Sequence, residues 1–262
     1  MTQLIFLGTG ASTGVPSFYC DCPACQEALN YPSLRRTCCS ILIQGKKNIL
    51  VDAPPDLRMQ LIREKINCLD AFFLTHSHYD HTGGLGELEF YVRLKSKQLL
   101  PAFMSPKTAY WLNSTHGFMG DCFSLHSFSE QDQVEIDGLK ISALEVKHTC
   151  GTNGLLITSQ SGKRTAYIPD SGPLPACTRE LLKEIDHLIL DATFWGQNWM
   201  PEDHNSVESA LKTGLDLNAK EIYLTHLSMH YAQPVTNQEL EAYIKNFGNH
   251  VHLAYDGLRF DL

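Results

Sequence analysis

The sequence lacks any long unbroken run of apolar residues, and its opening MTQLIFLGTG has neither a basic leader nor a small-residue cleavage site. A membrane-spanning helix needs about 18 consecutive apolar residues. An export signal needs a positively charged start followed by an apolar stretch. We therefore expect a protein that is neither exported nor embedded in a membrane and that works in the cytoplasm.

Positive charge is also scarce. Lys and Arg total 21 against 29 Asp and Glu, so the formal net charge is −8. A surface with this excess repels polyanions, so we expect no large nucleic acid among the partners. A small phosphate ester remains compatible as a substrate, because bound divalent cations would reverse the sign of the charge locally.

The nine cysteines are an odd count in a chain without an export signal, which favours free thiols or metal binding over disulfides. Cys20, Cys22 and Cys25 fall close together, and disulfides between such near neighbours would be strained. We therefore predict a structural zinc held by these thiolates, with His230 as the fourth ligand of a tetrahedral site. The alternative is that the three cysteines pack without a metal as small apolar groups.

Length and composition fit one compact α/β domain over residues 1–262, with 43% hydrophobic residues. Short apolar or alternating runs predict strands at 4–7, 40–43, 48–51, 71–74, 139–146, 155–158, 165–168, 187–190, 222–225 and 250–254. Helical spacing or capping residues predict helices at 55–65, 84–94, 206–214 and 237–247. Strands and helices spread over both halves predict two packed sheets with helices outside.

A dense group of metal-ligating side chains follows the apolar run 71–74. His76, His78, Asp80 and His81 lie within six residues. His76 and His78 are alternate residues after a strand and point to one side, while a tight turn aims Asp80 and His81 elsewhere, so one loop would serve two metals. Imidazole and carboxylate suit zinc, iron or manganese, and such ions make hydroxide available at neutral pH. A loop that only hydrogen-bonds is disfavoured, because it would leave costly polar groups at a strand end.

This HxHxDH run after an apolar strand resembles the signature of the metallo-β-lactamase superfamily. The resemblance implies a four-layer αββα sandwich, with further ligands at later strand ends. His148, Asp170 and His226 each follow a predicted strand in the required order. By this resemblance one metal takes His76, His78 and His148, the other takes Asp80, His81 and His226, and Asp170 bridges them.

Two narrower families share stretches of the chain. The CxCxxC segment at 20–25, LGTG at 7–10 and Thr225-His226 resemble the phosphoribosyl cyclic phosphate phosphodiesterase of the carbon-phosphorus lyase pathway. That family places its late zinc-binding His three residues after the metal His, whereas His230 follows His226 by four. Residues 48–58 and 190–195 instead resemble pyrroloquinoline quinone biosynthesis protein B, whose members have an altered histidine cluster. The intact cluster here favours hydrolysis.

We therefore predict a metal-dependent hydrolase, most simply a phosphodiesterase that attacks a small or cyclic phosphate ester with hydroxide from a dinuclear centre. The expected cofactors are two divalent ions, Zn or Mn, and one structural Zn. The alternatives are a protein similar to pyrroloquinoline quinone biosynthesis protein B, a tRNA-processing nuclease and a non-enzymatic binding protein. A homodimer is compatible with the sequence.

Asp80 and His204 are the predicted catalytic residues. His204 corresponds to a His near the active site in the resembled phosphodiesterase family and would protonate the leaving oxygen or bind phosphate. Glu208 lies four residues later and would orient the ring if the segment is already helical. Asp52 is predicted to accept a hydrogen bond from a metal-bound His, and Asp256 either does the same or shapes a turn.

Overall fold

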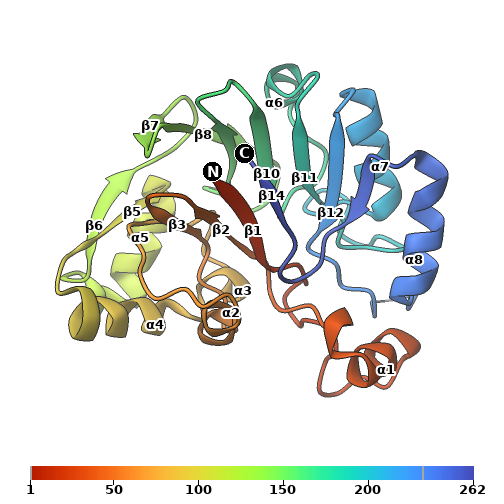
Figure 1. Ribbon diagram of the computed structural model, residues 1–262, viewed down its shortest axis with the longest axis horizontal. Helices are drawn as coiled ribbons and strands as arrows, with labels where there is room; N and C mark the ends of the chain where they lie inside the picture. Colours follow the sequence, from red (N-terminus) through yellow and green to blue (C-terminus); the bar gives the residue numbers. More distant parts are fainter. Residues whose placement is uncertain (1, 232) are drawn as a thin grey trace.

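The computed structural model describes residues 2–231 and 233–262. In this part of the chain, two seven-stranded mixed sheets lie face to face (Figure 1). The first sheet contains, in spatial order, β14 (Arg259–Asp261), β1 (Gln3–Gly8), β2 (Ser40–Gln44), β3 (Asn48–Val51), β4 (Ala71–Phe73), β5 (Leu100–Met104) and β6 (Phe123–Ser127). The second contains β13 (Val251–Leu253), β12 (Glu221–Thr225), β11 (His187–Asp191), β10 (Arg164–Ile168), β9 (Asn153–Thr158), β8 (Leu139–Glu145) and β7 (Gln133–Ile136).

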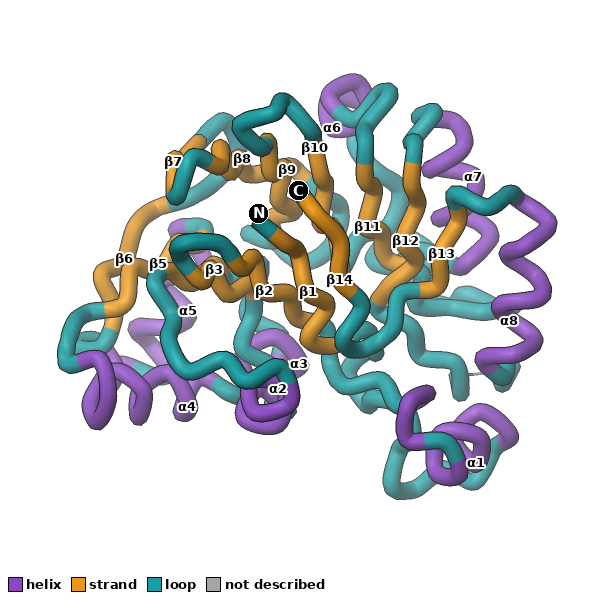
Figure 2. Tube along the Cα trace, in the orientation of Figure 1, coloured by secondary structure: helices purple, strands orange, loops and turns teal. Residues whose placement is uncertain are grey.

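The helices lie outside the pair of sheets (Figure 2). Those of the first half are α1 (Pro23–Asn30), α2 (Leu57–Arg63), α3 (Tyr79–Thr82), α4 (Leu85–Phe90) and α5 (Pro106–Thr115). Those of the second half are α6 (Ala176–Leu181), α7 (Val207–Asp216) and α8 (Asn237–Ile244). Short helical turns are η1 (Pro32–Leu34), η2 (Tyr91–Ser96), η3 (Gly117–Met119) and η4 (Lys245–Phe247). Among the described helices, none is both long and apolar enough to cross a membrane.

Three hydrophobic cores separate the four layers. Leu4 and Phe6 of β1 face the second sheet and pack with residues such as Tyr223, whereas Ile5 and Leu7 face α2 and α4. A third core joins the outer face of the second sheet to α7 and α8. This alternation along the central strands buries both faces of both sheets. The predicted αββα sandwich is confirmed.

Strand direction brings the loops of interest to one edge. The strands β3, β4 and β5 are parallel neighbours, and so are β10, β11, β12 and β13. Parallel strands end on the same side, where ligands bind outside their carboxyl ends in open α/β sheets. The polar segments that follow these strands therefore converge.

Candidate metal centre

Two sets of side chains meet at this edge. His76 and His78 follow β4, and His148 follows β8, and their nitrogens lie within 4.8 Å of one another. The second set comprises Asp80 and His81 of α3 and His226, which follows β12. The ligand atoms of these three side chains also lie within 4.8 Å of one another. The structure thus groups these six residues as the sequence analysis predicts for two ions.

Asp170, just past the end of β10, lies between the two sets. Its Oδ2 is 2.9 Å from Nε2 of His81, and its Oδ1 is 3.2 Å from Nε2 of His226 and 4.0 Å from Nε2 of His148. The side chain is almost fully buried. This is the place that a bridging carboxylate would occupy.

The cluster leaves polar atoms without partners. Nε2 of His76, Nε2 of His81 and Oδ2 of Asp170 are buried, and the 2.9 Å contact between the last two is the one polar contact that these three atoms make among the described residues. Leaving a buried polar atom unpaired costs about 1–3 kcal/mol. Neutral imidazoles and the carboxylate would offer lone pairs at all three atoms, which lie within 4.8 Å of one another, so cations would satisfy them together. The cluster is therefore consistent with a dinuclear metal site.

The charges around the cluster also suit cations. Burial lowers the pKa of His76 and of His78, so these rings stay neutral and keep their lone pairs. Burial also opposes charge on His81, but Asp170, with Asp52 and Asp80, outweighs it and raises the pKa of His81. Divalent ions would replace this proton as the counter-charge of the carboxylates.

The carboxylates themselves are held ionised. Burial favours the neutral acid at Asp80 and Asp170. The imidazoles of His81 and His226 outweigh that effect and lower the pKa of both residues. Both therefore present negative oxygen atoms, which are suitable ligands for Zn or Mn.

Outer contacts orient the imidazoles. Nδ1 of His148 lies 2.9 Å from the backbone oxygen of Asp203, and Nδ1 of His81 lies 2.8 Å from Oδ2 of Asp52. When Nδ1–H donates to these oxygens, Nε2 of each ring is left for a metal. Asp52 thus makes the contact that the sequence analysis predicts for it.

Backbone strain accompanies this arrangement. Asp52 and His226 adopt left-handed conformations, with φ of 64° and 57°. Such a conformation costs a non-glycine residue about 1–3 kcal/mol and is typically retained where a site requires it. The segment that carries His76, His78, Asp80 and His81 is followed by Gly84. A glycine is needed there, because a Cβ would lie 2.2 Å from the backbone oxygen of Pro54.

His204 stands beside both ligand sets. Its ring stacks on His226 with centroids 5.3 Å apart and meets His148 edge-on at 4.8 Å. Its Nδ1 lies 2.7 Å from Oδ2 of Asp191, the last residue of β11. Burial disfavours the charged ring, but the hydrogen bond and charge of Asp191, together with the charges of Asp170 and Asp80, outweigh this and raise the pKa of His204 to about 9.

The loop that carries His204 is fastened to the loop after Asp170. Nδ2 of Asn205 donates to the backbone oxygen of Ser171 at 2.7 Å. Gly172 permits the close approach, because a Cβ there would lie 2.1 Å from the backbone oxygen of Glu202. Asp191 and Asn205 were not found from sequence, although Asp191 follows an apolar strand as Asp170 does.

Two predicted supporting roles need correction. Asp191 at 2.7 Å and Asp170 at 3.7 Å, rather than Glu208, are the carboxylates near Nδ1 of His204 among the described residues. Asp256 accepts hydrogen bonds from Oγ1 of Thr9 at 2.8 Å and from the amide of Thr37 at 2.9 Å. These contacts join segments far apart in sequence, which is neither of the two roles predicted for Asp256.

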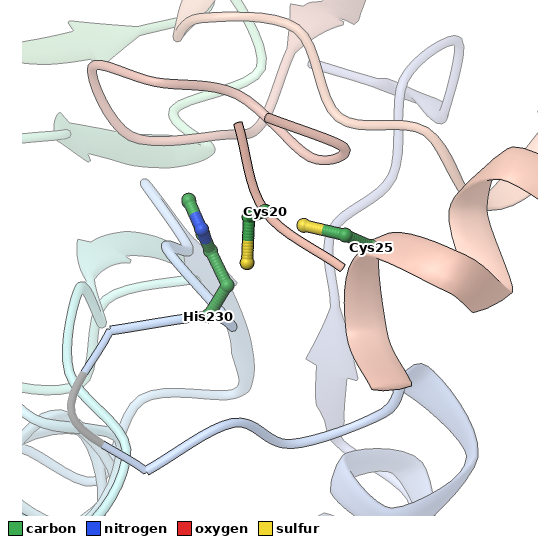
Figure 3. A group of neighbouring side chains, drawn as sticks. All are labelled: Cys20, Cys25 and His230. Atoms are coloured by element: carbon green, nitrogen blue, oxygen red, sulfur yellow. The ribbon is translucent and has the colours of Figure 1, made fainter. Parts of the chain in front are cut away.

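Two cysteines and a histidine form a further group of side chains (Figure 3). Cys20, Cys25 of α1 and His230 bring their ligand atoms within 4.8 Å of one another. Cys22, also predicted as a ligand, is the N-cap residue of α1; its thiol interacts with those of Cys20 and Cys25 but lies outside the 4.8 Å limit of this group. Burial raises the pKa of Cys25 to about 12, so a cation would be needed to stabilise its thiolate.

The sandwich and its His/Asp cluster define a hydrolase of the metallo-β-lactamase fold. Residues 47–227 match the Beta-lactamase superfamily domain, and the chain belongs to the metallo-β-lactamase superfamily. It is similar to the crystal structure of a new diphosphatase from the PhnP family, with 28% identity and a TM-score of 0.84 over 99% of this chain and 96% of that one. Zinc-bound PqqB from Methylobacterium extorquens shares the fold, with 20% identity and a TM-score of 0.83 over 99% of this chain and 100% of that one.

Two relatives in sequence are named for different activities. The octanoyltransferase of Porphyromonas gingivalis is 28% identical over 263 residues, which are 98% of this chain but 51% of that protein. The chain therefore spans about half the length of this relative. Ribonuclease Z of Saccharolobus islandicus is 25% identical over 281 residues, covering 88% of this chain and 90% of that protein.

Proposed function

We propose that this protein is a phosphodiesterase that hydrolyses a small, cyclic phosphate ester. The observation that carries the proposal is the pairing of His204 with Asp191 directly beside two intact ligand sets, which Asp170 connects. The similarity to a PhnP-family diphosphatase over nearly the whole chain supports chemistry at phosphorus.

Each ligand set would hold one divalent ion. His76, His78 and His148 form the first site and Asp80, His81 and His226 the second, with Asp170 shared between them. When bound, two Zn or Mn ions would supply hydroxide and stabilise the charge that develops on the phosphoryl oxygens. Cys20, Cys22, Cys25 and His230 would hold a separate structural zinc.

The chain's own residues would manage the protons. Hydrolysis joins the oxygen of water to phosphorus and breaks the bond from phosphorus to the ester oxygen, which must gain a proton. Asp191 favours the protonated form of His204, and because its Nδ1 is engaged by Asp191, its Nε2 is the nitrogen that would donate. The ionised carboxylate of Asp80 is available to accept a hydrogen bond from the attacking water.

The substrate class follows from charge. The net charge of −8 disfavours a grip on a long polyanion, although ribonuclease Z is a relative. We therefore propose a small ester as the partner and no large nucleic acid. A homodimer remains a prediction, which analytical ultracentrifugation would test.

A substrate screen tests the proposal. Purified protein reconstituted with Zn or Mn would be assayed on adenosine 2′,3′-cyclic phosphate, ribose 2,3-cyclic phosphate, bis(4-nitrophenyl) phosphate, a dinucleoside diphosphate and precursor tRNA. We expect turnover of the cyclic esters. Turnover confined to the diphosphate or to the tRNA would contradict the proposal in favour of those activities, and ligand binding without any turnover, unchanged by metal removal, would indicate a binding protein.

His204→Ala tests the role of the proton donor. The variant should keep its metals and lose roughly 10²- to 10⁴-fold in turnover of a ribosyl ester, the usual range for general acid catalysis. An ester that releases nitrophenolate needs little protonation, so its rate should fall much less. Equal losses on both esters, with a raised KM, would instead assign His204 to phosphate binding.

A further inference from the structure

We propose that Trp199 stacks on the base of a nucleoside, so that the cyclic phosphate ester of the proposed function is a nucleoside cyclic phosphate. This inference rests on the proposed function and names its substrate class. The observation behind it is an aromatic cluster, formed by Phe194, Trp199 and Tyr231, that begins at His204 and ends in an exposed indole.

The cluster is continuous with the metal-site edge. The ring of Phe194 is buried, with its centroid 6.2 Å from that of His204. The indole of Trp199 lies 4.8 Å from Phe194 at an interplanar angle of 70°, and Tyr231 lies 5.6 Å from Trp199 and 6.0 Å from Phe194. Trp199 is therefore two ring contacts away from the proposed proton donor.

Trp199 is exposed although it is held in place. Half of its surface is accessible (50%), while both of its ring neighbours are more buried. Nδ2 of Asn198 donates to the backbone oxygen of His204 at 2.9 Å, and the amide of His204 donates to the backbone oxygen of Met200 at 2.9 Å. These bonds fix the loop on either side of the indole. A large apolar ring that is ordered beforehand at the rim of a polar site loses little entropy when a ligand covers it.

The chemistry of the rings favours a base over other groups. Every nucleobase has a π face, and stacking on an exposed aromatic side chain is tolerant of base identity. The net charge of −8 gives no basic track for further phosphates, so the ligand is a single nucleotide unit rather than a strand. A substrate whose reacting phosphate lies beside His204 would place its base one sugar away, towards Trp199.

A matched pair of substrates isolates the stacking. Adenosine 2′,3′-cyclic phosphate and ribose 2,3-cyclic phosphate share the reacting bonds and differ by the base. Trp199→Leu keeps apolar bulk but removes the stacking face, so kcat/KM for the adenosine ester should fall roughly 5- to 150-fold, equivalent to ~1–3 kcal/mol per stacked base. The ribose ester should be unaffected, and Trp199→Phe should retain most of the activity. Tyr110→Ala, which removes an exposed ring on α5, is the control and should change neither rate.

Binding measurements separate this inference from the proposed function. Isothermal titration of the metal-loaded protein with adenosine 3′-phosphate and with ribose 3-phosphate should show tighter binding of the first, and Trp199→Leu should abolish the difference. Equal binding of the two by the wild type, or equal weakening of both in the variant, would overturn the inference even if cyclic esters are hydrolysed. If adenosine 3′-phosphate binds preferentially, this preference depends on Trp199 and no ester is hydrolysed, the stacking site is supported and the proposed phosphodiesterase activity is contradicted.

Discussion

Replacing Asp191 with Asn tests the central electrostatic argument about His204. The substitution keeps the size of the side chain but removes the charge that lies 2.7 Å from Nδ1 of His204. Asp191 is the largest of the groups that oppose the effect of burial, ahead of Asp170 and Asp80, so without its charge the pKa of His204 should fall well below about 9. The variant should therefore carry less positive charge on His204 at neutral pH.

The size of the effect on stability follows from linkage. A pKa raised from 6.5 to about 9 corresponds to roughly 3 kcal/mol, since one pKa unit is worth about 1.36 kcal/mol. Because the pKa of His204 is raised on folding, this contribution is fully present below pH 6.5 and is lost as the pH rises through about 9. The difference in unfolding free energy between wild type and Asp191→Asn should thus be larger at pH 6 than at pH 10, by at most about 3 kcal/mol, because Asp170 and Asp80 supply part of the shift and remain in the variant.

The assay is urea unfolding at both pH values after treatment with EDTA, so that no bound cation competes with the imidazolium. An NMR titration of the histidine side chains, assigned with His204→Ala, would give the pKa directly. Glu208→Gln is the matched control, because Glu208 does not contact His204 among the described residues, and it should leave the titration unchanged. A wild-type His204 that titrates near 6.5, or a stability difference that does not vary with pH, would refute the reasoning.

The remaining predictions concern the metals. Asp80→Ala should abolish hydrolysis in a folded protein by removing a ligand of the second ion, and near-normal turnover would contradict the two-ion assignment. Cys25→Ser should lower Tm more than turnover and should remove one zinc per chain; a zinc content equal to that of the wild type would disprove this. Asp52→Asn, which weakens the support of His81, should lower metal affinity about 10- to 100-fold in competition with a chelator.

Much of the cluster was predictable because its chemistry is local. His76, His78, Asp80 and His81 are close together after an apolar run, and His148 and His226 follow runs that form β8 and β12. A strand fixes the direction in which the chain leaves the sheet. Residues just past parallel strands can therefore be assigned to one edge of the sheet even when the strand order is not known. The same reasoning yielded α2 and α7, because their apolar spacing and capping residues lie within one segment.

Elements that depend on distant partners left no local signal. The three residues of β14 pair with β1 from the other end of the chain, as in the register of Gln3 with Asp261. The strand β7 lies at a sheet edge, and its side chains are alternately exposed and partly buried. Its sequence therefore does not distinguish a strand from a polar loop. The cysteine segment was interpreted as a loop, although Pro23 begins α1, with Cys22 as its N-cap residue and Cys25 in its first turn.

The error at His204 shows how such partners are better sought. The choice of Glu208 assumed that a helix had already begun at His204, but α7 begins at Val207, so the four-residue spacing has no geometric meaning there. The actual partner, Asp191, ends β11, which is the parallel neighbour of β10 with Ile168 opposite Leu190. Carboxylates that follow adjacent parallel strands come together whatever their separation in sequence. Comparing the residues at the ends of neighbouring strands would have linked Asp170 with Asp191. Both carboxylates lie near Nδ1 of His204.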